Sequence, residues 1–142
     1  MKTKLRLIML SIIGIAIIYG VIWYTSPLDL IQLNPEDVEK ISIFDGNTGT
    51  SLHLTKDEDI AYIINNLNAV KLKRSKISLG YLGYSFKTTI YLNNGEKVAG
   101  WNDFIINPKD TIRKDPFFYR VVEGSIDYQY INSLIEEQNS KG

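Results

Sequence analysis

The chain has 142 residues, enough for one domain of ordinary size and a short additional segment. It carries 16 basic and 16 acidic side chains, so it lacks the basic excess of nucleic-acid-binding proteins, and we expect no nucleic-acid partner. It contains no cysteine and one histidine, which excludes disulfides, thiolate chemistry, lipid attachment through cysteine and a multi-histidine metal site within one chain. We expect neither a cofactor nor a bound metal.

An uncharged apolar run lies near the start of the chain: residues 7–24 read LIMLSIIGIAIIYGVIWY. A helix of this length spans roughly 27 Å, close to the ~30 Å hydrocarbon core of a bilayer. Lys2, Lys4 and Arg6 precede the run, whereas every Asp and Glu follows it. This asymmetry predicts a single-pass signal-anchor helix in the cell membrane, with residues 1–6 in the cytoplasm and the C-terminal domain outside.

The alternative is a secretory signal peptide that is cleaved off. Its cleavage site would be a small-x-small triplet beyond the apolar run. The triplet 14–16 (GIA) lies inside the run, and after its end Ser26 is followed by Pro27, with bulky Tyr24 two positions before Ser26. The aromatic residues at the end of the run also suit the outer membrane interface, where Tyr and Trp are enriched. These features favour an anchor that is retained.

Two small residues, Ala16 and Gly20, are separated by three positions in the anchor. Such a small-xxx-small pair allows a second helix to approach closely, but small residues are also frequent in membrane helices in general. Ala16 and Gly20 are therefore candidate positions for packing between transmembrane helices, and the oligomeric state stays open.

Residues 25–37 predict a juxtamembrane spacer, since PLDLIQLNP has prolines at both ends. A spacer of this length reaches at most ~30 Å, which keeps the following domain near the lipid headgroups. Apolar and polar residues then alternate over residues 38–44 and 51–55, on either side of the turn sequence DGNTG. This pattern predicts a β-hairpin.

Residues 56–68 predict an amphipathic helix, because apolar residues recur there at helical spacing. Thr55 and Glu58 have the spacing of a capping box with Thr55 as the N-cap. The apolar stripe that we expect to be buried consists of Ile60, Ile63, Ile64 and Leu67.

The second half of the chain predicts further strands and a closing helix. Residues 84–92 alternate, Asn94-Gly95 favours a two-residue hairpin turn, and residues 96–106 predict the partner strand with Ile90 opposite Ala99. Residues 117–122 predict a last strand and residues 125–138 a helix. We therefore expect an α+β domain over residues 38–138, in which an antiparallel sheet of about five or six strands carries two helices in the order ββα-βββ(β)-α. Residues 139–142 form a polar tail.

Four segments carry a resemblance: VEKISIFDGNTG, LTKDEDIAYIINNL, YSFKTTIYLNNGE and FFYRVV followed by YINSLI. In hydrophobic pattern and turns, residues 38–136 resemble small extracytoplasmic domains of low-GC Gram-positive bacteria, which are carried as lipoproteins or single-pass proteins. Many of those domains have no assigned function. The resemblance implies a location outside the cell, but it implies no functional residue and, in the absence of cysteine, no lipid attachment.

The sequence KLKRSK contains the one basic cluster, made of Lys71, Lys73, Arg74 and Lys76. It could contact anionic lipid headgroups, an anionic envelope polymer or an acidic protein partner. The alternative is an edge strand that its lysines protect against aggregation. A second candidate is the loop GYLGYSF, whose Tyr81 and Tyr84 could either bind a ligand or cap the core with their hydroxyls outward.

Catalytic and metal patterns are weaker. DGNTG resembles the start of a calcium loop, but Lys56 stands at position 12, where such a loop needs an acid. His53 should face away from the core, and Ser51 shares its face without a third group of a catalytic triad. We therefore expect no enzyme.

The sequence thus predicts a single-pass, membrane-anchored extracytoplasmic interaction module that is not catalytic and binds a protein or an envelope or lipid-surface partner. Two alternatives are an envelope-associated enzyme of unknown reaction and a membrane-complex subunit that works mainly through its transmembrane helix.

Overall fold

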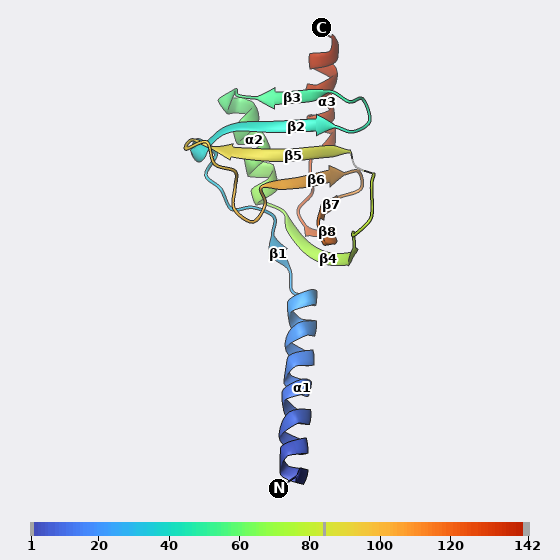
Figure 1. Ribbon diagram of the computed structural model, residues 1–142. Helices are drawn as coiled ribbons and strands as arrows, with labels where there is room; N and C mark the ends of the chain where they lie inside the picture. The colour runs from blue at the N-terminus through green and yellow to red at the C-terminus, as the bar shows by residue number, and fades with distance from the viewer. Residues whose placement is uncertain (1, 84, 141–142) are drawn as a thin grey trace.

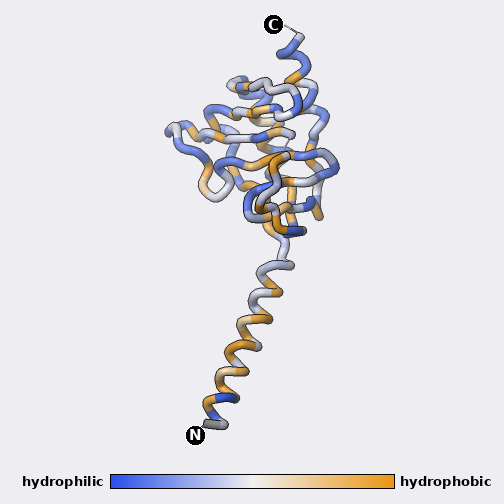
Figure 2. Tube along the Cα trace, turned by 45° about the vertical axis from the view of Figure 1, so that its right-hand side comes forward, coloured by the Kyte–Doolittle hydropathy of each residue, from blue (hydrophilic) through white to orange (hydrophobic). Residues whose placement is uncertain are grey.

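A computed structural model describes residues 2–83 and 85–140. One long helix, α1 (Lys2–Thr25), projects from a domain that contains a single antiparallel sheet and the helices α2 (Asp57–Asn68) and α3 (Tyr128–Ser140) (Figure 1). Figure 2 shows α1 as a predominantly apolar rod, and its stretch Thr3–Thr25 is long and apolar enough to cross a membrane. The predicted α+β class with an N-terminal apolar helix is confirmed.

The sheet has eight strands in the order β1-β4-β8-β7-β6-β5-β2-β3, so the predicted five or six strands are an undercount. The prediction missed β1 and β7 because they are short, whereas β4 contains KLKRSK, for which an edge strand is one of the two predicted alternatives. A short 3-10 helix, Pro35–Asp37, precedes the second strand. The strands are β1 (Leu28–Asp29), β2 (Val38–Asp45), β3 (Ser51–Leu54), β4 (Lys71–Ile77), β5 (Phe86–Leu92), β6 (Asp103–Asn107), β7 (Thr111–Lys114) and β8 (Phe117–Glu123).

The segment expected to be a spacer contributes to the domain. Leu28 lies opposite Leu72 of β4, and the side chains of Leu30 and Ile31 are buried in the core. Burial of these apolar side chains offsets the entropy of ordering the segment. Only residues 26 and 27 therefore separate the anchor helix from the sheet.

The helices α2 and α3 cover one face of the sheet, and the core lies between (Figure 1). All four apolar residues of the predicted stripe of α2 are buried. The predicted capping box is wrong: Lys56 is the N-cap, so Glu58 takes the second helical position instead of the third. Three acidic residues in the first turn still suit the positive end of the helix dipole.

The predicted register of the second hairpin, with Ile90 opposite Ala99, is also wrong. Thr88 lies opposite Phe104, and β6 begins only at Asp103 because residues 98–102 leave the ladder. This loop brings Trp101 onto the core, where its ring stands edge-on to those of Phe104 and Tyr119. Packing of a large aromatic ring thus outweighs continuous strand pairing.

Candidate interaction surface

The C-terminal end of α1 is bonded to the sheet. The Tyr24 hydroxyl donates to the carbonyl of Ser75 (2.9 Å), and Arg74 Nη1 donates to the carbonyl of Trp23 (2.7 Å). The Arg74 guanidinium also lies 3.9 Å from the centre of the Trp23 ring. The rings of Trp23 and Tyr24 stand edge-on to Phe117 of β8, at centroid distances of 6.1 and 6.0 Å. The joint therefore combines ring packing with a charge-assisted hydrogen bond.

The four predicted cations of the basic cluster lie on β4 but have different surroundings. Lys71 forms an exposed ion pair with Glu123 (2.9 Å), and Arg74 belongs to the joint. Lys76 lies over the Phe118 ring, 4.8 Å from its centre, and Lys73 lies opposite Arg120 of β8. Because β1 pairs only with the first two residues of β4, the rest of this strand has one unpaired side, as the edge-strand alternative requires.

Residues 78–83 and 85, which we call the strap, lie over the face of the sheet that the helices leave open. They connect β4 to β5, which are separated in the sheet by β8, β7 and β6 (Figure 1). Tyr81 stands edge-on to Phe118 at 5.1 Å, and Phe118 points away from the core to which its neighbour Tyr119 belongs. Tyr81 therefore covers an apolar side chain of the open face, while it stays 55% exposed itself.

One arginine holds the strap in place. Arg113 of β7 donates through Nη1 to the carbonyls of Tyr81 (2.8 Å) and Gly83 (2.9 Å), and its Nε lies 3.6 Å from Asp115. Asp115 also accepts a hydrogen bond from Ser78 (2.5 Å) at the start of the strap. Tyr84, the other aromatic residue predicted here, lies outside the described residues.

A groove of about 610 Å³ lies on one side of the strap. Its cationic lining residues are Lys76 and Arg120, its rings are Tyr81 and Phe118, and no Asp or Glu is among the described residues that line it. The remaining wall is polar and neutral, with Asn47, Ser75, Ser85, Asn107 and Thr111 among its residues. We call this cavity the cationic groove.

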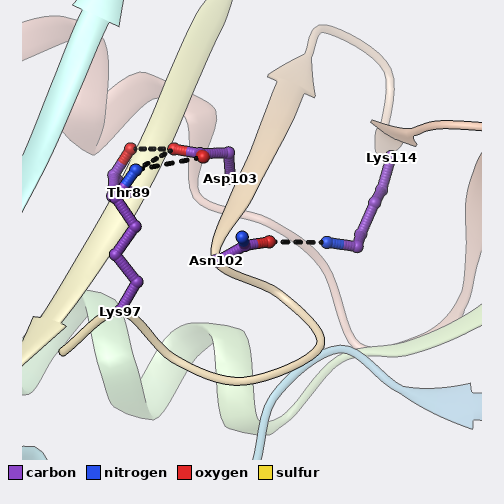
Figure 3. Close-up of polar contacts among 5 residues, drawn as sticks. All are labelled: Thr89, Lys97, Asn102, Asp103 and Lys114. Carbon is purple, nitrogen blue, oxygen red and sulfur yellow. Dashed lines mark hydrogen bonds and ion pairs between the residues drawn. The ribbon is translucent and has the colours of Figure 1, made fainter.

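A smaller cavity of about 260 Å³, which we call the balanced pocket, is lined in part by Arg113 and Asp115, the two residues that hold the strap. Its lining includes Lys87, Arg113 and Lys114, but also Asp103 and Asp115. Figure 3 shows Asp103 accepting from the Thr89 hydroxyl (2.5 Å) and from Lys97 Nζ (3.2 Å). Both carboxylates of this pocket thus have a cationic partner within the fold, Lys97 for Asp103 and Arg113 for Asp115.

The surroundings of Asp103 and Lys114 shift both pKa values. Burial raises the pKa of Asp103, but the hydrogen bonds from Thr89 and Lys97 outweigh it, so the net pKa is lowered. Burial lowers the pKa of Lys114, and the charge of Asp103 opposes that effect only in part. Lys114 donates to Asn102 (3.1 Å) and lies 5.7 Å from the centre of the Trp101 ring, so its contacts hold the loop before β6 (Figure 3).

Two other sequence motifs have structural roles. In DGNTG, Asp45 accepts hydrogen bonds from the backbone and side chain of Asn47 and from the hydroxyl of Thr48, as in an Asx turn. His53 is exposed, as predicted. Its ring nitrogen Nδ1 shares a hydrogen bond with the hydroxyl of Ser42 on the neighbouring strand (3.0 Å), a partner that sequence reasoning missed. Within the described part of the chain, no carboxylate is bonded to the other ring nitrogen of His53.

Ala16 and Gly20 lie on the exposed anchor helix, where an added Cβ at Gly20 would meet nothing within 4 Å. Their packing against a second helix stays a prediction. Sequence reasoning missed Arg113 and Arg120, although the alternation of FFYRVV could have placed Arg120 on the face opposite Tyr119 and Val121.

No protein-family model, no curated protein and no solved structure matches the chain.

Proposed function

We propose that this chain is a single-pass, membrane-anchored interaction module, whose domain lies outside the cell and binds a partner at the outer surface without catalysis. The observation that carries the proposal is the joint between α1 and the sheet. Trp23 and Tyr24 are bonded to Arg74 and Ser75 and packed on Phe117. An anchor that is part of the packing of the domain supports retention, because cleavage of α1 would remove two of the rings that cover Phe117.

The joint also supports a fixed orientation of the domain above the membrane. Only two residues link α1 to β1, and the contacts with β4 and β8 restrict rotation about this link. A charge-assisted hydrogen bond contributes about 1.5–3 kcal/mol, and a cation–π contact at an exposed site about 0.5–1 kcal/mol. β4 and the strap are thereby presented to partners next to the headgroups.

Retention and orientation are tested first. The full chain is expressed in cells, the N-terminal sequence of the mature protein is determined, and Thr50→Cys is treated with a membrane-impermeant maleimide. Since the chain has no other cysteine, labelling reports this site alone. We expect an intact N-terminus and labelling of intact cells. A mature protein that begins near residue 27, or a Thr50→Cys variant that is labelled only after lysis, would contradict the proposal.

The rigidity of the joint is tested by the distance between nitroxides at Ile17→Cys and Asn139→Cys, in the full chain in nanodiscs. We expect one narrow distance distribution, and Arg74→Ala should broaden it because the Trp23 carbonyl loses its donor. Lys56→Ala, an exposed substitution in the N-cap of α2, is the control and should leave the distribution narrow. A distribution that is already broad without Arg74→Ala would show that the joint does not fix the domain.

A further inference from the structure

The partner of the cationic groove can be specified further. We propose that the groove binds the phosphate of an anionic lipid headgroup, in the same membrane that α1 spans. This inference rests on the proposed function, because it requires the domain to stand beside that membrane.

The first argument is uncompensated charge. Lys73 and Arg120 lie directly opposite each other on β4 and β8, and like charges in such pairs repel. Lys76 and Arg120 line the groove, and none of these three cations forms an ion pair with a described carboxylate. An anion in the groove would turn this repulsion into attraction.

The second argument is the neutral wall. The hydroxyls of Ser75 and Ser85 form no hydrogen bond with another described residue, and both residues line the groove. The side chain of Asn107 uses its oxygen to accept from the backbone of Ser85 (3.2 Å), which leaves its amide group as a donor. Cations together with neutral donors are what a phosphate requires, and the volume of about 610 Å³ is within the usual range of ligand sites.

The third argument places the ligand in the membrane. Four of the six exposed large apolar side chains described outside α1 lie within residues 77–82: Ile77, Leu79, Tyr81 and Leu82. Ile77 lies opposite Phe117, which packs on Trp23 and Tyr24 at the end of the anchor. β4 is also the long strand nearest to α1 in Figure 1. Apolar side chains beside uncompensated cations are typical of surfaces that lie in the interface of an anionic membrane.

The test uses the full chain in nanodiscs of phosphatidylcholine, with and without phosphatidylglycerol. A nitroxide at Leu79→Cys reports the depth of the strap from its relative accessibility to oxygen and to a water-soluble nickel complex. We expect the label to lie in the interface when phosphatidylglycerol is present and to be more water-exposed without it. A label at Asn139→Cys, in the last turn of α3, should stay in water in both discs, because this end of α3 lies opposite α1 in Figure 1. A Leu79 label that is as water-exposed as the Asn139 label in both discs would overturn the inference.

Charge reversal in the groove tests the role of its cations. Lys76→Glu and Arg120→Glu should each lower the docked population in phosphatidylglycerol discs by at least about fivefold, which corresponds to about 1 kcal/mol for each charge near an anionic surface. Lys56→Glu changes the net charge of the chain by the same amount, but Lys56 is distant from the strap in the sequence. This substitution should therefore have little effect on docking. Equal effects of all three substitutions would assign docking to net charge and overturn the groove as the binding site.

Two further arms separate the possible failures. A label at Ile17→Cys must lie within the bilayer. If this label is in water, the proposed anchor itself is wrong. If the Ile17 label is in the bilayer but the Leu79 label is exposed to water, only the headgroup inference is wrong. Glycerol phosphate added to phosphatidylcholine discs tests a soluble source. Binding of glycerol phosphate to the groove would broaden its ³¹P line, and Arg120→Glu should abolish that broadening. If glycerol phosphate binds in this way while the lipid does not dock, the lipid assignment is overturned.

Discussion

The two cavities beside the strap share one sheet face but differ in how their charges are compensated. In the balanced pocket, Asp103 is bonded to Lys97, and Asp115 lies beside Arg113. In the cationic groove, the lining residue Arg120 lies opposite Lys73, which is itself outside the lining, and no described acidic residue lines the groove. Carboxylates thus lie among the cations of the balanced pocket, whereas the described lining of the groove has cations and no carboxylate.

The comparison shows why a count of charges does not reveal function. The balanced pocket has more ionisable side chains, and it contains the lysine and the aspartate whose pKa values are shifted. Each of these groups nevertheless has a partner in the domain that accounts for it. The cationic groove is the better candidate because its cations lack such partners. Three substitutions test this distinction, from the largest expected effect to the smallest.

Asp103→Ala should destabilise the domain by about 1.5–3 kcal/mol, the usual value of hydrogen bonds to a charged group, because Thr89 and Lys97 lose their acceptor. The measurement is denaturant unfolding of the full chain in a neutral detergent. Asp103→Asn keeps an acceptor for Thr89 and should cost less. An unchanged midpoint for Asp103→Ala would show that the balanced pocket is not held by its charges.

Thr89→Val should cost about 1 kcal/mol at neutral pH and make the domain more sensitive to acid. The lowered pKa of Asp103 means that its ionised form contributes stability above the unfolded pKa of about 3.9, and this stability is lost as pH falls through the folded pKa. Without the Thr89 hydroxyl, one of the interactions that oppose the effect of burial is lost, so the pKa of Asp103 is less lowered and the loss begins at a higher pH.

The melting temperature of both proteins between pH 3 and pH 7 measures this effect. The control is Thr50→Val, in the turn between β2 and β3. Parallel pH profiles for Thr89→Val and the unsubstituted chain would exclude the hydrogen bond as the cause of the lowered pKa.

Lys73→Glu has the smallest expected effect, with the opposite sign. It places a carboxylate opposite Arg120, and in neutral detergent it should stabilise the domain by about 0.2–1 kcal/mol. Lys71→Glu is the matched control on the same strand and should destabilise, since it breaks the ion pair with Glu123. If Lys73→Glu destabilises as well, the cations of the groove are not in mutual repulsion, and the contrast between the cavities disappears.

Local patterns were sufficient for much of the fold. Apolar spacing predicted α1, the buried stripe of α2 and the strands β2, β3, β5 and β8, because each of these elements buries or exposes its own periodic face. They were insufficient for β1 and β7, and for β4 they indicated an edge strand only as one of two alternatives. A two-residue strand has no period, and KLKRSKI becomes a strand only by pairing with β8.

The candidate site divides in the same way. The sequence indicated Lys73, Lys76 and Tyr81 by composition alone, but it could not assign Lys71 and Arg74 to different partners. It also missed Arg120, which lines the groove and which the register of β4 and β8 places opposite Lys73. Cross-strand neighbours depend on register, and in this sheet the loop before β6 and the shift at Ser75 change the register where no residue pattern marks it.

The sequence by itself determined that this protein has an apolar helix of membrane length and an α+β domain without cysteine, since helix length, hydropathy and residue type are properties of short segments. Tertiary structure alone decided that the end of the helix is bonded to β4, that the strap crosses the open face, and that one of its two flanking cavities has uncompensated cations. These features arise from contacts between residues about thirty or more positions apart, such as Arg74 with Trp23 and Arg113 with Tyr81. Only folding brings such residues together.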